Sequence, residues 1–97
     1  MQQKVKDFNG EKRLSPQIRM LDIVSETGEL TKEIIKGCNY GESEFKVSYD
    51  LKMELGDTLY AILSFCNENQ INSQECLEMA LEKYKQRLIK KGNMSSK

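Results

Sequence analysis

The chain has 97 residues, of which 38% are hydrophobic and 31% are charged. This composition fits one globular domain, and a chain this short buries a smaller fraction of its surface than a larger domain does, so we expect oligomers that share a core. Fifteen basic residues balance fifteen acidic ones, so the chain lacks the net basic field that would attract nucleic acid.

Histidine is absent from the sequence. This excludes Ser-His and Cys-His nucleophiles, zinc sites with histidine ligands and Glu-x-x-His di-iron bundles. The three cysteines show no Cys-x-x-Cys spacing and no signal peptide precedes them, which predicts a reduced, cytoplasmic setting with Cys66 and Cys76 as small core residues. No apolar run approaches the ~20 residues that a membrane span requires.

Apolar residues at helical spacing predict four helices joined by short polar connectors. The first covers about residues 2–8, with Val5 and Phe8 facing inward. The second has Ser15 as its N-cap, carries proline at its first position and covers about residues 16–36. Its expected core-facing arc consists of Met20, Leu21, Ile23, Val24, Leu30, Ile34 and Ile35.

Two longer helices are predicted in the second half of the chain. The third begins near residues 44–47, ends at about Asn67 and is apolar on almost every side, which is typical of a buried helix. The fourth begins after Asn72, which forms a capping-box pattern with Glu75, and ends near Lys91. Its expected core-facing residues are Leu77, Leu81, Tyr84 and Leu88. The sequence thus predicts an all-α, four-helix domain over residues 1–91, completed by oligomerisation, and a flexible C-terminal tail over residues 92–97.

Two short acidic patterns lie within the second and third predicted helices: Glu26-x-x-Glu29 and Glu54-x-x-Asp57. Residues three apart in a helix differ by about 60° in direction, so each pair points its carboxylates the same way. Such like charges repel, and few cations on the second helix relieve the repulsion. Each pattern alone is common on a solvated helix face. Their joint occurrence, together with the buried character of the third helix, favours a metal site.

If the two acidic pairs face each other across a helix interface, they form a site with oxygen ligands only. Carboxylates and water suit Mg²⁺ or Mn²⁺ rather than zinc or copper, and Mg²⁺ in turn suits phosphate substrates. Three further acidic residues lie close to the pairs, and we interpret them as solvated or outside the metal ligands. These are Asp22, Glu33 and Asp50.

Lys83 and Arg87 lie one turn apart on the predicted fourth helix, and neither has an acidic residue three or four positions before it. They are free to meet the acidic sites or a triphosphate, where arginine binds phosphate oxygens in bidentate fashion. A solvated basic face near a helix C-terminus explains the same pattern equally well.

Together, these motifs resemble those of a known family. Glu26-x-x-Glu29, followed after 24 residues by Glu54-x-x-Asp57, resembles the signature of the MazG-like, all-α nucleotide pyrophosphohydrolases, and Lys83-x-x-x-Arg87 resembles the basic pair on that family's last helix. The resemblance extends over about residues 5–87. It implies a homodimer or homotetramer, Mg²⁺ held by the four carboxylates, and phosphate contacts from the basic pair.

The reaction that the resemblance implies is the hydrolysis of a nucleoside triphosphate to a monophosphate and pyrophosphate, with cleansing of the nucleotide pool as a candidate role. The main alternative is a non-catalytic helical dimer that acts as a regulatory or interaction module, in which the acidic pairs need not converge. A nucleic-acid binder that uses the basic stripe at Lys83–Lys91 is a weaker third interpretation, and it predicts strongly salt-dependent binding.

Overall fold

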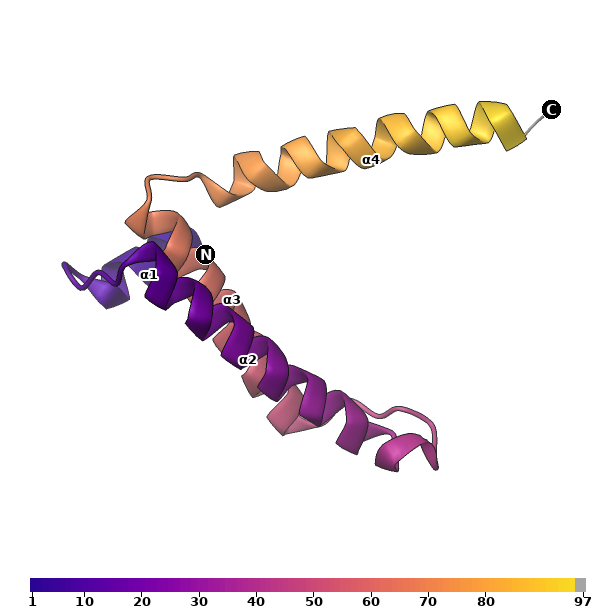
Figure 1. Cartoon of the computed structure of the whole chain (residues 1–97), viewed down its shortest axis with the longest axis horizontal. Coiled ribbons are helices and arrows are strands. Elements are labelled where there is room, and N and C mark those ends of the chain that lie inside the picture. The colour runs from indigo at the N-terminus through magenta and orange to yellow at the C-terminus, as the bar shows by residue number, and fades with distance from the viewer. Residues whose placement is uncertain (96–97) are drawn as a thin grey trace.

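The structure of the chain is a computed structural model that describes the backbone of residues 1–95 and the side chains of residues 1–92. It contains four α-helices and one short 3₁₀ helix, and the described residues form no strand, so the predicted all-α class is confirmed (Figure 1). The elements in chain order are α1 (Gln2–Asn9), α2 (Pro16–Gly37), η1 (Asn39–Gly41), α3 (Tyr49–Glu68) and α4 (Ser73–Ser95).

Side-chain caps fix where the three long helices begin. The Ser15 hydroxyl accepts a hydrogen bond from the Ile18 amide at 3.2 Å, and the Asn72 side chain accepts one from the Glu75 amide at 3.1 Å, as predicted. The start predicted for α3, near residues 44–47, was wrong. The hydroxyl of Ser48 caps α3 by accepting from the Leu51 amide at 3.0 Å, while its own backbone is extended.

α2 and α3 form an antiparallel hairpin, which is the packed body of the molecule (Figure 1). The hairpin closes at Gly37, whose carbonyl accepts from the Lys46 amide at 2.9 Å. A Cβ at this position would lie 2.8 Å from both the Lys46 carbonyl oxygen and the Phe45 ring. The return loop can therefore approach the end of α2 only because residue 37 has no side chain.

α1 lies across α3 and is held there by polar contacts. The Tyr60 hydroxyl donates to the Asn9 side-chain oxygen at 2.5 Å, and the Asn9 amide donates to the Ser64 hydroxyl at 3.0 Å. Val5 is half-buried, but the prediction that Phe8 faces inward was wrong, because Phe8 is 82% exposed and meets only the edge of the Tyr60 ring.

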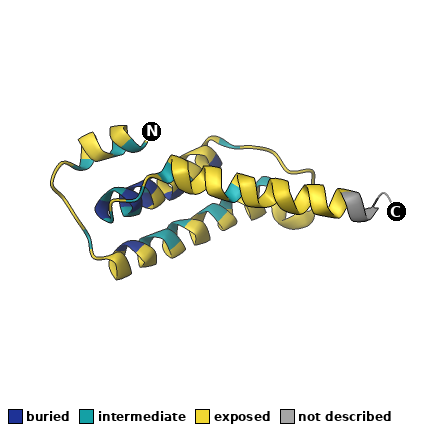
Figure 2. Cartoon of the chain, turned by 90° about the horizontal axis from the view of Figure 1, so that it is seen from above, coloured by how far each residue is buried: buried dark blue, intermediate teal, exposed yellow. Residues whose placement is uncertain are grey.

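The apolar core of one chain is thin. Among the described residues, the only buried hydrophobic side chains are Leu51, Ala61, Leu63 and Cys66 (Figure 2). The predicted arc on α2 is largely exposed, with only Ile23 and Leu30 half-buried, and exposed leucine, isoleucine and methionine side chains also contradict a fully buried α3. Cys76, expected in the core, is exposed as well.

α4 extends away from the hairpin (Figure 1). Its first turn is anchored, because the Gln2 side-chain oxygen accepts from the Ser73 amide at 2.8 Å, but α4 makes no extensive packing contact with another helix in the described part of the chain. The side chains predicted to face the core are 55–70% exposed: Leu77, Leu81, Tyr84 and Leu88. They are apolar at helical spacing, yet more than half of the surface of each residue remains exposed.

The end of α4 also differs from the prediction. The helix continues through Gly92 to Ser95, whereas the sequence predicted its end near Lys91. Ser96 and Lys97, the last residues of the predicted flexible tail, lie outside the described residues. None of the helices described combines the length and the hydropathy needed to cross a bilayer.

Candidate metal centre

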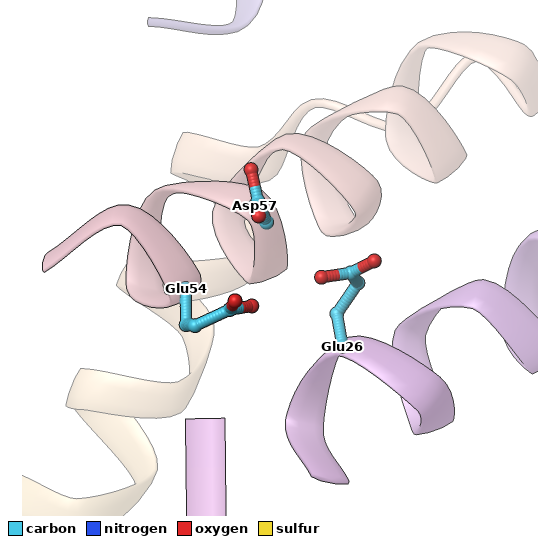
Figure 3. Close-up of side chains that lie close together, drawn as sticks. All are labelled: Glu26, Glu54 and Asp57. Carbon is cyan, nitrogen blue, oxygen red and sulfur yellow. The ribbon is translucent and has the colours of Figure 1, made fainter. Parts of the chain in front are cut away.

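The acidic pairs predicted from the sequence lie on the facing sides of α2 and α3. Residues on α2 that face α3 recur every three or four positions, and Glu26 is one of them. On α3, Glu54 lies on the side that faces α2, one turn before Thr58. Carboxylate oxygens of Glu26, Glu54 and Asp57 all lie within 4.8 Å of one another (Figure 3). Both helices thus deliver carboxylates to one point.

This acidic cluster, defined as Glu26, Glu54 and Asp57, has no cation of its own. None of the three carboxylates forms an ion pair within the described residues. Glu26 and Glu54 are half-buried, and Asp57 is exposed. Partial burial raises the pKa of Glu54, and the neighbouring carboxylates of Asp57 and Glu26 raise it further. The cluster is therefore a concentration of uncompensated negative charge at the edge of a helix interface.

The remaining acidic side chains of α2 are each paired with a cation three positions away. Asp22 lies 3.3 Å from Arg19, Glu29 3.3 Å from Lys32, and Glu33 3.4 Å from Lys36. The expectation that few cations on this helix relieve its acidic stripe was wrong. These three side chains are not among the carboxylates that lie within 4.8 Å of one another, although Glu29 and Glu33 still contribute to the raised pKa of Glu54.

The donor set of the acidic cluster fits a hard divalent cation. Three carboxylates that lie close together without a counter-charge are costly, and a bound Mg²⁺ or Mn²⁺ would offset that cost. The open, half-exposed setting leaves room for water and phosphate oxygens, which Mg²⁺ commonly retains as ligands. No nitrogen or sulfur ligand lies in the cluster, so the chemistry does not favour zinc.

Comparison with protein families shows to which family the chain belongs. A family model described as the MazG nucleotide pyrophosphohydrolase domain matches residues 14–90. The chain belongs to this family. The match covers α2, α3 and most of α4, and hence both acidic pairs and the basic pair, while α1 lies outside it. No curated protein and no solved structure gave a significant match.

Glu29 is the one predicted metal ligand of this MazG domain that lies outside the cluster. Its side chain is half-exposed and pairs with Lys32, although its charge still contributes to the raised pKa of Glu54. An exposed ion pair of this kind contributes ~0–1 kcal/mol, so little holds the carboxylate in its present position. In this arrangement the Glu29 carboxylate belongs to the Lys32 ion pair and not to the acidic cluster.

The predicted phosphate-binding residues of the MazG domain do not lie at the acidic cluster of their own chain. Lys83 and Arg87 are on α4, which extends away from the α2–α3 hairpin (Figure 1). The Lys83 ammonium lies 4.9 Å from the centre of the Tyr84 ring, and Arg87 forms no ion pair with any residue that the structure describes. One chain thus carries both the acidic cluster and the basic pair of the predicted site, but the two groups do not lie close together.

Sequence reasoning overlooked Glu68, which fixes how α2 and α3 pack beyond the acidic cluster. Glu68 is 9% exposed and binds Arg19, which is 3% exposed. A signal was available, because Glu68 is a charged residue at the end of a helix predicted to be buried, and such a residue requires a buried partner.

Proposed function

We propose that this MazG domain is a magnesium-dependent pyrophosphohydrolase that converts a nucleoside triphosphate into a nucleoside monophosphate and pyrophosphate. The observation that carries the proposal is the approach of Glu26, Glu54 and Asp57 to within 4.8 Å of one another from two different helices. Membership of the family supports the reaction class.

In the proposed site, Glu26, Glu54 and Asp57 hold the metal, and Glu29 joins them as the fourth ligand when its pairing with Lys32 breaks. Bound Mg²⁺ would supply the positive charge that stabilises the phosphate oxygens in the transition state. The carboxylates would hold the metal where it can meet the triphosphate. Lys83 and Arg87 bind its phosphate oxygens, with the guanidinium donating two hydrogen bonds.

The experiment that tests the proposal compares the wild-type chain with Glu54→Gln/Asp57→Asn in pyrophosphate release from a panel of ribo- and deoxyribonucleoside triphosphates. Loss of the metal site removes several kcal/mol of transition-state stabilisation, so we expect kcat/KM to fall at least ~100-fold. Glu44→Gln, in the exposed loop before α3, removes the same kind of charge away from the cluster and should leave kcat/KM unchanged.

Calorimetric titration with Mg²⁺ and a non-hydrolysable triphosphate provides a second measurement. The wild-type chain should bind both and the double variant neither. A wild-type chain that binds neither and releases no pyrophosphate from any triphosphate would refute the enzyme and favour a non-catalytic helical module.

A further inference from the structure

The first residue of α1, Gln2, fastens the corner between α3 and α4. Its side-chain oxygen accepts from the Ser73 amide at 2.8 Å and from the Ser73 hydroxyl at 2.6 Å. Its side-chain nitrogen donates to the Ile71 carbonyl at 2.7 Å, and its own carbonyl accepts from the Asn67 side chain at 3.1 Å. One residue thus contacts the last turn of α3, the connector and the first residue of α4.

These contacts suit a glutamine side chain. The Ser73 amide belongs to the first turn of α4, where backbone amides have no partner within the helix. The Asn72 side chain caps the Glu75 amide, and the Gln2 oxygen supplies the acceptor for the Ser73 amide. An amide side chain offers an acceptor and a donor side by side, so it holds the helix start and the connector at once.

The other end of α1 is fixed to the body of the molecule. Asn9, the last residue of α1, accepts from the Tyr60 hydroxyl and donates to the Ser64 hydroxyl, and both partners are on α3. α1 is therefore held on α3 at both ends, and Gln2 ties the start of α4 to it. α1 lies outside residues 14–90, which match the MazG family model, so this contact is an addition to the matched domain.

The direction of α4 depends on few contacts in the described part of the chain. α4 makes no extensive packing contact with another helix there, and it extends away from the hairpin (Figure 1). The connector consists of residues 69–72 alone. Its Ile71 amide donates back to the Cys66 carbonyl at 2.8 Å, which holds the connector on α3 but not the direction of α4. The contact between Gln2 and Ser73 supplies a second point of attachment for α4.

A small change of direction at Ser73 grows along α4. At the 1.5 Å rise per residue of an α-helix, Lys83 lies about 15 Å and Arg87 about 21 Å beyond Ser73. A tilt of about 10° at Ser73 therefore moves Arg87 by about 4 Å. A misplacement of about 1 Å can lower the rate of an enzyme ~100-fold, so the basic pair depends on how firmly α4 is held.

We propose that Gln2 is a positioning residue, which sets the angle between α3 and α4 and thereby the place of Lys83 and Arg87. In this role Gln2 touches neither the metal nor the phosphates and acts only through the start of α4. The angle itself is independent of the reaction, whereas its effect on catalysis rests on the proposed function.

Three variants separate the hydrogen bonds from the bulk of the side chain. Gln2→Met keeps the length of the side chain and removes both hydrogen-bonding groups, while Gln2→Glu keeps the acceptor for Ser73 and loses the donor to Ile71. Gln3→Met is the matched control, because the Gln3 side chain is exposed and donates to Asp7 of its own helix at 2.8 Å. Glutamine, methionine and glutamate have similar helix propensities, so α1 should form equally in all three variants.

Pulsed electron paramagnetic resonance measures the angle without any activity. Spin labels are attached to Lys52→Cys on α3 and Lys85→Cys on α4, two exposed positions, in a chain whose native cysteines are replaced by serine or alanine. The labelled chain is diluted with unlabelled chain, so that the distances measured lie within one chain.

The chain with Gln2 intact and Gln3→Met should give the same narrow distance distribution. The distribution for Gln2→Met should be broader or shifted by about 4 Å, as a tilt of about 10° requires, and that for Gln2→Glu should be intermediate. If Gln2→Met does not fold, Gln2→Glu takes its place in the comparison. A distribution equal to that of Gln3→Met overturns the proposal.

Kinetics test whether Gln2 acts through the basic pair. At a temperature at which circular dichroism shows the variant to be folded, Gln2→Met should lower kcat/KM at least ~10-fold, and Gln3→Met should not. In Lys83→Ala/Arg87→Ala, measured at high enzyme concentration, Gln2→Met should cause no further loss, because residues that act together are not additive. An additive loss overturns the role of Gln2 in placing the basic pair.

The two proposals fail in distinguishable ways. If the wild type releases no pyrophosphate from any triphosphate, the proposed function is refuted, and the distance distributions still decide whether Gln2 holds α4. If the wild type is active and Gln2→Met retains its full kcat/KM, the proposed function stands and Gln2 does not position the basic pair.

Discussion

Arg19 and Glu68 form a buried, two-pronged ion pair between α2 and α3. The guanidinium donates from Nε to one carboxylate oxygen at 3.0 Å and from Nη2 to the other at 2.7 Å. The Leu14 amide donates to the same carboxylate at 3.2 Å, and Arg13 donates to the Glu68 carbonyl. This cluster joins the connector before α2, the start of α2 and the end of α3, and so fixes how the two helices align at the acidic cluster.

Removing one partner of the Arg19–Glu68 pair should lower the free energy of unfolding. Arg19→Met leaves the Glu68 carboxylate buried without its counter-charge, which typically costs about 3–5 kcal/mol. We expect the free energy of unfolding in urea to fall by that amount. Arg19→Met/Glu68→Leu replaces both charges with apolar groups and should recover most of the loss. A double variant as unstable as the single one would show that packing, not charge, accounts for the cost.

Acid should weaken the same contact. The hydrogen bond from Arg19 lowers the pKa of Glu68 below 4.5, so the pair contributes stability above that pH and loses it as the pH falls through the lowered pKa. The Tm of the wild type should therefore drop below pH 4.5, and Arg19→Met/Glu68→Leu should lose less of its Tm over the same range. If the Tm of both proteins depends on pH in the same way, Glu68 does not contribute to the loss of stability in acid.

Glu54 should behave in the opposite way, because its pKa is raised. The ionised carboxylate destabilises the metal-free fold, and this destabilisation disappears as the pH falls through the raised pKa. Glu54→Gln should therefore raise the Tm of the metal-free protein at neutral pH, while Glu44→Gln should not. Mg²⁺ should raise the Tm of the wild type and have little effect on Glu54→Gln. A lower Tm for metal-free Glu54→Gln would contradict the repulsion inferred here.

Two glycines should respond oppositely to alanine. At Gly37 the new Cβ would meet the Lys46 carbonyl and the Phe45 ring at 2.8 Å, and forcing a methyl group into such a site typically costs about 1–3 kcal/mol. At Gly56, inside α3, nothing lies within 4 Å of the new Cβ, so Gly56→Ala should stabilise the helix by about 0.5–1 kcal/mol. Urea unfolding of both variants measures this contrast.

Local chemistry was readable from the sequence. Ser15 and Asn72 were predicted as helix caps because a cap is decided by hydrogen bonds to residues only three positions away. The start of α3 was missed because the apolar pattern before Ser48 resembles a helix, while the hydroxyl of Ser48 provides the cap. Periodicity identifies an apolar face, but it does not tell which chain covers that face. This is why Leu81 and Leu88 were predicted to face the core, although both are more than half exposed in one chain.

The acidic part of the candidate site could be predicted from the spacing of its residues. The spacing Glu54-x-x-Asp57 on α3 predicted that both carboxylates reach the side facing α2, and they do. Glu29 departs from the prediction because Lys32, three positions along the same helix, attracts its carboxylate. The separation of Lys83 from the cluster depends on the direction in which α4 leaves α3, which residues distant in sequence determine.

The thin core links the activity of the protein to its concentration in the cell. One chain buries only four hydrophobic side chains within its described part, and the oligomer expected from the sequence would cover more of its apolar surface. Dilution would then weaken folding, so specific activity should rise with protein concentration. The abundance of the chain would itself act as the control on its output.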